Sequence, residues 1–430
     1  MKLKYGTLFV LATALAIVLH SSPEITAHID DVTYLPNDHP AIHYSAKPEN
    51  DPLARLQKKL DSGEVKLAYS SRFGWYPALL QYFGINADSQ LLVFSKTSFQ
   101  ATKISPSAPR AIYFNDEVAL GYVPNGDVVE VAAFDPRQGY NYYTMDMGNS
   151  DKPQFIRRDS CLQCHQGVGT LGVPGILVTS VYPGPDGMPA FRGSAMITDD
   201  RSKFEDRWGG WYVTGTTGSM SHMGNAVAHN PAQPQLLDLQ GTRNLLSLER
   251  KFDTSRYLVP TSDVVALMTL EHQTRMSNLM IRVGWDTRIA EADGKMDDAG
   301  RARIDGEIEE MVKYMLFADE HLLDDPVEGV STFTKTFPER GPKDHLGRSL
   351  RDFDLQRRLF KYPLSYMIYS PAFDGMPDYV RERVYQRLYD VLSGKDQSPV
   401  YARLTPEDRR NVLEIVRETK KGLPTYWKES

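Results

Sequence analysis

Both cysteines of this 430-residue chain lie in one pentapeptide, Cys161-Leu162-Gln163-Cys164-His165. Two cysteines separated by two residues and followed by histidine form the attachment pattern of a c-type haem. Each thiol can add to one vinyl group of the haem, and the imidazole of the adjacent histidine then ligates the iron. The pattern therefore predicts one covalently attached haem c per chain, with His165 as proximal axial ligand. No cysteine is left for a disulfide elsewhere.

Two other roles of a Cys-x-x-Cys pair fit the sequence less well. A structural zinc site usually has four ligands, and the chain contains no second cysteine pair that could complete one. A thioredoxin-like dithiol sits at a helix N-terminus after an apolar strand. Here the polar and basic residues 154–160 precede the first cysteine. Haem attachment is the preferred interpretation.

The N-terminus independently indicates export. Lys2 and Lys4 precede an apolar stretch over residues 7–19, which has the length of a signal-peptide core and is short for a membrane span. We expect residues 1–22 to be a signal peptide, or an uncleaved N-terminal anchor. Because haem is attached covalently on the outer side of the bacterial inner membrane, the two signals agree on a periplasmic location.

Composition limits the partners. The chain has 49 basic and 55 acidic residues, a formal net charge of -6, so the sequence predicts no nucleic-acid partner. Beyond residues 1–22 it contains no apolar run long enough to span a membrane. We expect a redox partner protein instead.

The chain divides into regions with different periodicity. Residues 23–50 are expected to form an irregular arm, 51–150 a β-rich region, 151–255 a haem-binding cytochrome c-like region, and 256–430 a helical region that packs on it. Asn125-Gly126 marks a β-hairpin turn. The predicted fold class is α+β, with an N-terminal antiparallel β-rich region, a haem segment and a predominantly helical C-terminal half. The expected helices span residues 52–60, 262–283, 299–323, 353–362, 376–393 and 405–420, and the expected strands span 91–94, 111–114, 118–123, 128–131 and 175–182.

Three residues could supply the second axial ligand of the iron. Met223 is the first choice because it lies in a Gly-rich aromatic stretch and offers a soft thioether, and the adjacent His222 is the alternative. His272 falls on the apolar face of the predicted helix 262–283 and could also reach the iron. Each of the three could instead pack in the core.

Basic residues near the motif could pair with the haem propionates. Arg157 and Arg158 lie just before the first cysteine, and Arg207 with Trp208 could add guanidinium and indole donors. Ordinary surface charge is the alternative for each arginine.

Several strings in the chain resemble those of a family of large bacterial exported single-haem cytochrome c-domain proteins, over roughly residues 65–427. The resemblance implies an exported haem protein and specifies no substrate. One departure is visible, because Thr216-Thr217 stands where the family pattern has a histidine. The matching strings are residues 110–116, 159–165, 207–215, 222–225, 270–274, 347–354 and 363–370.

Two functions from different classes follow. In the first, His165 and a methionine or histidine ligate the iron, and the protein is an electron-transfer cytochrome. In the second, the distal position is open and the large remainder of the chain builds the pocket of a peroxidase- or oxygenase-like haem enzyme. A ligand-binding sensor is a third, weaker interpretation. The sequence favours electron transfer.

Overall fold

The structure of the protein, a computed structural model, describes residues 34–46, 50–190, 195–239 and 241–428. The predicted signal peptide and the first part of the predicted arm, residues 23–33, lie outside the described residues. Among the helices that are described, none has both the length and the apolar character required to cross a bilayer.

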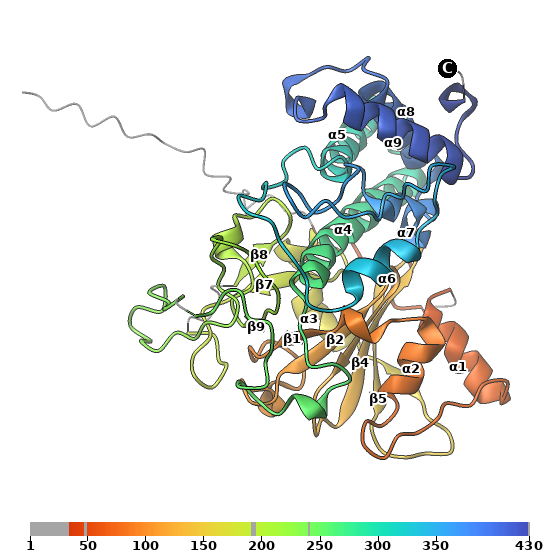
Figure 1. Cartoon of the computed structure of the whole chain (residues 1–430). Helices are drawn as coiled ribbons and strands as arrows, with labels where there is room; N and C mark the ends of the chain where they lie inside the picture. Colours follow the sequence, from red (N-terminus) through yellow and green to blue (C-terminus); the bar gives the residue numbers. More distant parts are fainter. Residues whose placement is uncertain (1–33, 47–49, 191–194, 240, 429–430) are drawn as a thin grey trace, which may run out of the picture. The chain divides into compact units, whose positions relative to one another are not determined.

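An antiparallel sheet occupies the N-terminal half (Figure 1). Within the described residues it has seven strands in the order β6-β5-β4-β3-β2-β1-β9. The predicted hairpin turn joins β3 to β4, where Asn125 has a left-handed φ of 58°. The strands are β1 (Leu91–Val93), β2 (Arg110–Phe114), β3 (Val118–Tyr122), β4 (Val128–Asp135), β5 (Gly139–Asp146), β6 (Phe155–Arg157) and β9 (Trp211–Tyr212).

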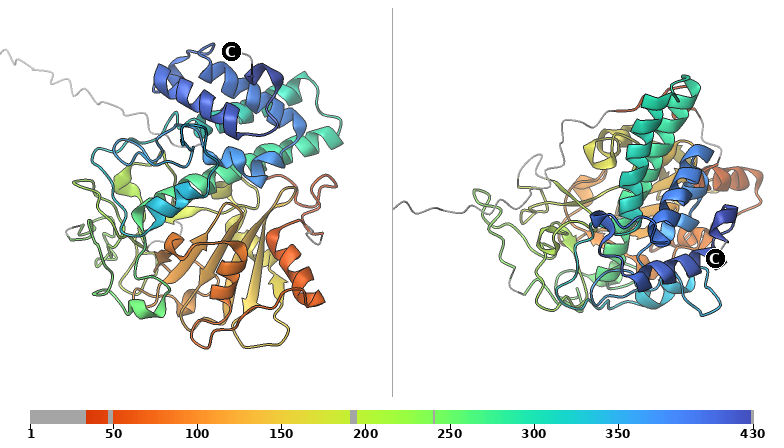
Figure 2. Two further views of the ribbon diagram at one scale, coloured as in Figure 1. Left: turned by 45° about the vertical axis from the view of Figure 1, so that its right-hand side comes forward. Right: turned by 90° about the horizontal axis from the view of Figure 1, so that it is seen from above.

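Helices cover both faces of this sheet (Figures 1 and 2). Helices α1 (Pro52–Ser62) and α2 (Tyr76–Phe83) pack on the face that carries Val129, Val131 and Ala133. Helix α4 (Val264–Ala292) packs on the opposite face, which carries Phe134 and Tyr142. Side chains alternate between the faces of a strand, so one strand supplies both cores.

The remaining helices follow α4 in the sequence and extend its core. They are α5 (Asp298–Met315), α6 (Phe333–Glu339), α7 (Pro371–Asp374), α8 (Asp378–Leu392) and α9 (Pro406–Thr419). An antiparallel sheet in the N-terminal half and helices in the C-terminal half confirm the α+β class. The sheet and the helices belong to one unit of the chain, Thr33–Ser430.

Some predicted boundaries were wrong. The predicted helix 353–362 is a hairpin-like loop, in which Leu355 has a left-handed φ of 58° and its N–H donates to the Arg358 carbonyl at 2.9 Å. Apolar residues spaced for a helix can equally line a loop that folds back on itself. The predicted helix 299–323 ends at Met315, and the predicted strand 175–182 forms only β7 (Val178–Ser180), which pairs with β8 (Met196–Thr198). Helices α2 and α6 were not predicted.

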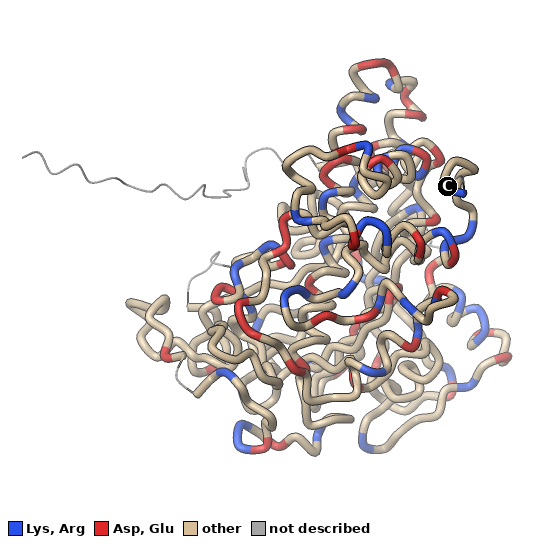
Figure 3. The backbone as a smooth tube through the Cα atoms, turned by 45° about the horizontal axis from the view of Figure 1, so that its top comes forward, with Lys and Arg blue, Asp and Glu red and all other residues tan. Residues whose placement is uncertain are grey.

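Charged residues of both signs are intermixed along the backbone (Figure 3). This distribution agrees with the nearly balanced composition of 49 basic and 55 acidic residues.

Candidate functional site

The Cys-x-x-Cys-His motif forms a short helical segment on the α4 side of the sheet. Cys161 ends a 3₁₀ turn and Leu162–His165 form α3. Cys161 is half-buried and packs against the core shared with α4, whereas Cys164 is exposed. Both thiols are free. The segment is therefore anchored on one side and open to solvent on the other.

The imidazole of His165 is held by one of its two nitrogens. Nδ1 lies 3.0 Å from the carbonyl oxygen of Gly175, and the ring packs on Tyr142 with centroids 4.9 Å apart. Among the described residues, Nε2 has no hydrogen-bond partner. Burial lowers the pKa of His165 to about 4, with the Gly175 hydrogen bond opposing the shift. A neutral imidazole whose Nδ1 donates to a backbone carbonyl has the tautomer and orientation of a metal ligand.

The loop after His165 is tied back to the histidine. The Gly175 N–H donates to the His165 carbonyl at 2.9 Å, and the Thr170 hydroxyl donates to the same oxygen at 3.2 Å. The Tyr142 hydroxyl also donates to the Gly175 carbonyl, at 2.6 Å. In addition, the Asn37 side chain reaches Gln166 at 2.8 Å from the N-terminal arm. Residues 165–175 thus hold the ring in one orientation.

A strip of the sheet adjoins the motif. Cross-strand register places Gly121, Glu130, Thr144 and Ile156 side by side on the same face, from β3, β4, β5 and β6. Ile156, at the end of this row, is 51% exposed, whereas Thr144 and Gly121 are buried. We call these four residues the sheet strip.

Two arginines lie over the sheet strip. Arg110 spans the position where Gly121 lacks a side chain and pairs with Glu130, Nη2 to Oε2, at 2.8 Å. Its Nε is buried without a hydrogen-bond partner. Arg158 donates from Nε to the Thr144 hydroxyl at 2.8 Å. Burial and Glu130 raise the pKa of the Cys161 thiol, while Arg110 and Arg158 oppose the rise. Sequence reasoning found Arg158 and missed Arg110, which no local pattern distinguishes.

The other residues predicted to contact propionates, Arg157, Arg207 and Trp208, have protein surroundings of their own. Arg157 donates to the carbonyls of Tyr44 and Ala46 in the N-terminal arm and pairs with Asp159. Arg207 is buried and pairs with Glu271 at 3.3 Å. Trp208, beside it, is fully buried with Nε1 unpartnered. In this structure the guanidinium groups of Arg157 and Arg207 bond to protein groups, and Trp208 Nε1 is enclosed by protein.

The three residues predicted as distal ligands are all buried. Met223 is 4% exposed and its sulfur accepts from the Ser180 hydroxyl at 3.5 Å. His222 is 1% exposed and packs edge-on against Trp208, and burial lowers its pKa to about 4. His272 is fully buried with both nitrogens engaged, as described below. No hydrogen bond or ring contact among the described residues joins any of them to residues 161–165.

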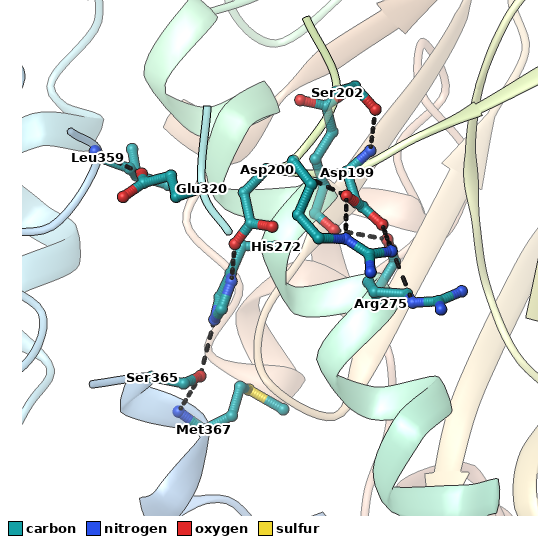
Figure 4. A network of polar contacts seen from close by, with 12 residues as sticks. Asp199, Asp200, Ser202, His272, Arg275, Glu320, Leu359, Ser365 and Met367 are labelled. Carbon is teal, nitrogen blue, oxygen red and sulfur yellow. Dashed lines mark hydrogen bonds and ion pairs between the residues drawn. The ribbon is translucent and has the colours of Figure 1, made fainter. Parts of the chain in front are cut away.

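His272, on α4, belongs to a buried network of polar contacts (Figure 4). Its Nδ1 lies 2.9 Å from Asp200 Oδ2, and its Nε2 lies 2.7 Å from the Ser365 hydroxyl. The ring stacks against Tyr314 and Phe317, with centroid distances of 5.2 and 4.5 Å. The alternative interpretation of His272, a core histidine held by a carboxylate, describes this geometry.

A carboxylate, an imidazole and a hydroxyl follow one another here as in a catalytic triad, in Asp200, His272 and Ser365. Unlike the serine of a triad, Ser365 is not accessible to a substrate. Ser365 is fully buried, and its oxygen also accepts the Met367 N–H at 3.3 Å in the first turn of a 3₁₀ helix. A nucleophile must reach the reacting atom of a substrate. The enclosed hydroxyl therefore supports a structural role rather than hydrolysis.

A second buried pair adjoins this network. Arg207 Nη1 lies 3.3 Å from Glu271 Oε2, and the side chains are 3% and 0% exposed. Burial raises the pKa of Glu271 to about 7, and Arg207, Thr198 and Trp208 oppose the rise. The Thr198 hydroxyl and Trp208 Nε1 lie near this carboxylate, although among the described residues neither they nor Glu271 Oε1 has a hydrogen bond of regular geometry.

One histidine pair has a spacing that also occurs in zinc sites. His39 and His43 lie four residues apart in the arm. Both ring nitrogens of His39 are occupied, Nε2 by Asp293 at 3.1 Å and Nδ1 by the Ala41 N–H at 3.1 Å. His39 therefore has no free nitrogen with which to complete a zinc site together with the two cysteines.

The donor set of the motif fits a covalently attached haem. Two free thiols and an imidazole nitrogen without a protein partner among the described residues lie beside the sheet strip, and two arginines border them. No model of a known protein family, no curated protein and no solved structure matches the chain.

Proposed function

We propose that the protein is an exported c-type cytochrome that carries one haem and transfers electrons. One observation supports this most strongly: His165 is fixed through Nδ1 to the Gly175 carbonyl, with Nε2 left free, directly after two unpaired thiols. Such anchoring of the second nitrogen is the usual companion of an axial histidine. The resemblance noted above and the signal-like N-terminus support the same proposal, including a periplasmic location.

In this proposal each residue has a defined role. Cys161 and Cys164 form the thioether bonds, and His165 is the proximal axial ligand. Arg158 and Arg110 provide positive charge for the propionates beside the sheet strip, because each guanidinium is partly free of protein acceptors there. The haem supplies one-electron redox chemistry, and the chain fixes its position and its electrostatic surroundings. A periplasmic redox protein would be its partner.

Met223 is the proposed sixth ligand, and it would have to release the Ser180 hydroxyl to bind iron. A second function is favoured by the surroundings of the three candidate distal ligands. All three, Met223, His222 and His272, are buried and contact groups outside the motif, which leaves the distal position of the iron without an evident protein ligand. An open iron would support a haem enzyme of the peroxidase or oxygenase type.

Optical spectroscopy of the haem-loaded protein distinguishes these functions. A low-spin spectrum with a thioether-to-iron band and no response to carbon monoxide supports electron transfer with methionine ligation, and Met223→Ala should abolish that band. Ser180→Ala, which removes the present partner of the sulfur, is the matched control and should retain it. A high-spin spectrum that changes with carbon monoxide supports the open site.

Haem attachment itself is tested by extraction. The double variant Cys161→Ala and Cys164→Ala should release its haem into acidified organic solvent, whereas Gln163→Ala should retain it. Haem that stays bound to the double variant after denaturation would disprove covalent attachment at this motif.

A further inference from the structure

A small cavity lies at the edge of the buried network. Its volume is about 10 Å³, which is the room that one water molecule requires. Four of its lining residues are buried: Asp200, Tyr314, Phe317 and Glu320. Arg201, Glu310, Lys313 and Asp319 complete the lining.

Two polar atoms of lining residues lack partners. Asp200 Oδ1 and the Tyr314 hydroxyl are buried without a hydrogen bond among the described residues. Asp200 is 4% exposed and Tyr314 5%. Buried polar atoms without a protein partner usually bind an internal water molecule. The two unpartnered atoms and the size of the cavity therefore indicate one such molecule.

Glu320 is a buried carboxylate in the lining of this cavity. Its carboxylate accepts the Leu359 N–H at 3.0 Å (Figure 4), and it is 5% exposed. Among the described residues, no basic side chain forms a salt bridge with it. Of the other acidic residues that line the cavity, Glu310 and Asp319 are exposed, and Asp200 is buried and faces His272. Two buried carboxylates that interact cannot both ionise without a large cost.

The neighbouring basic residues are directed to other groups. Arg207 pairs with Glu271 and Arg201 with Asp199. Arg358 lies 3.6 Å from Asp408. At the mouth of the cavity, Lys313 pairs with Glu310. Arg403 donates to the backbone carbonyl of Glu320 and not to its carboxylate.

We propose that Glu320 holds a proton in the native protein and that one water molecule joins it to Asp200 Oδ1 and the Tyr314 hydroxyl. This internal proton-binding site continues through Asp200 into the His272–Ser365 chain. It is independent of the haem. In support, burial raises the pKa of Glu320 to about 8, Asp200 adds to the rise, and the Leu359 N–H, Arg358 and Arg207 oppose it.

Infrared spectroscopy of the full chain tests the site. The wild-type protein near neutral pH should show the carbonyl stretch of a protonated carboxyl group, which shifts in deuterated solvent and disappears with a midpoint near pH 8. Glu320→Gln should remove this component. Glu310→Gln, at the mouth of the same cavity and exposed, should retain it. Glu271→Gln should also retain it, which separates Glu320 from the second buried glutamate.

The connection to Asp200 has its own test. Asp200→Asn removes the neighbouring negative charge, so the midpoint of the Glu320 component should move to lower pH while the component itself remains. Persistence of the full band in Glu320→Gln, or its absence from wild type at pH 6.5, would overturn the proton assignment. An unmoved midpoint in Asp200→Asn would overturn the shared site. If Asp200→Asn fails to fold, Tyr314→Phe, which removes the third polar group, should shift the midpoint instead.

Discussion

The Cys-x-x-Cys-His motif and the buried network each contain a histidine, and the two histidines differ in their bonding. His165 lies on a short helix beside the sheet strip, with one nitrogen bonded and the other without a partner among the described residues. His272 lies inside α4, fully buried, with both nitrogens bonded and its ring packed on Tyr314 and Phe317. A nitrogen without a protein partner can bind a ligand, whereas a fully bonded and enclosed ring stabilises the fold.

The same contrast applies to the charges. Arg110 and Glu130 border the Cys-x-x-Cys-His motif and remain 22% and 12% exposed, so water still screens them. Arg207 and Glu271 are almost completely buried. Removing one partner from the second pair leaves a charge in an apolar interior. We therefore expect stability to depend on the network and haem binding to depend on the motif.

The largest expected effect follows from breaking the buried pair. Glu271→Ala should lower the free energy of unfolding by about 3–5 kcal/mol, because the Arg207 charge loses its buried partner. Denaturant titration measures this loss. Glu310→Ala, in the exposed pair with Lys313, should change it by less than about 1 kcal/mol. Equal losses of the free energy of unfolding in the two variants would contradict the expected difference between the buried and the exposed ion pair.

A pH dependence should follow from the raised pKa of Glu271. Below pH 4.5 this group is protonated in both the folded and the unfolded chain; between 4.5 and about 7 only the folded chain keeps its proton. The folded state therefore loses stability as pH rises through this window, by at most roughly 1.4 kcal/mol per unit, and no further above it. Urea unfolding at pH 5 and pH 8 should show a smaller decline in Glu271→Gln than in wild type. The exposed variant Glu249→Gln should match wild type.

A smaller loss is expected from the serine beside His272. Ser365→Ala should reduce the free energy of unfolding by about 1–3 kcal/mol, since it leaves His272 Nε2 buried without a partner. Thermal or denaturant unfolding would measure the loss. Ser62→Ala, at an exposed helix end, is the control and should lie within about 0.5 kcal/mol of wild type. If Ser365→Ala left the free energy of unfolding unchanged, the hydroxyl would contribute nothing to the stability of the network.

The smallest effect on stability should come from the motif itself. In the haem-free protein, His165→Ala should change the free energy of unfolding by about 1 kcal/mol, the value of one hydrogen bond to the backbone. The same variant should lose the normal haem spectrum. A loss as large as that of Glu271→Ala would show that the motif is part of the structural core.

Much of the fold could be predicted because its signals are local. The hairpin turn at Asn125 and the positions of strands β1 to β4 follow from neighbouring residues, whereas β5, β6 and β9 were not predicted. The loop over residues 353–362 could not be predicted, because its apolar spacing suits a helix and only tertiary contacts make it fold back. For the site, the motif was evident, but Arg110 was not, because β2 and the motif meet only through the sheet.

By itself, the sequence determined the α+β order of elements and the placement of two thiols and an imidazole in one short segment, since covalent spacing controls both. Only the tertiary structure decided which charges meet. Asp200 and Ser365 lie 72 and 93 residues from His272 in the chain, yet both bond to its ring. It also separated Arg158, beside the motif, from Arg207, inside the protein. A buried arginine requires a partner for its charge whatever its position in the sequence. Which group becomes that partner depends on the packing of elements that are distant in the chain.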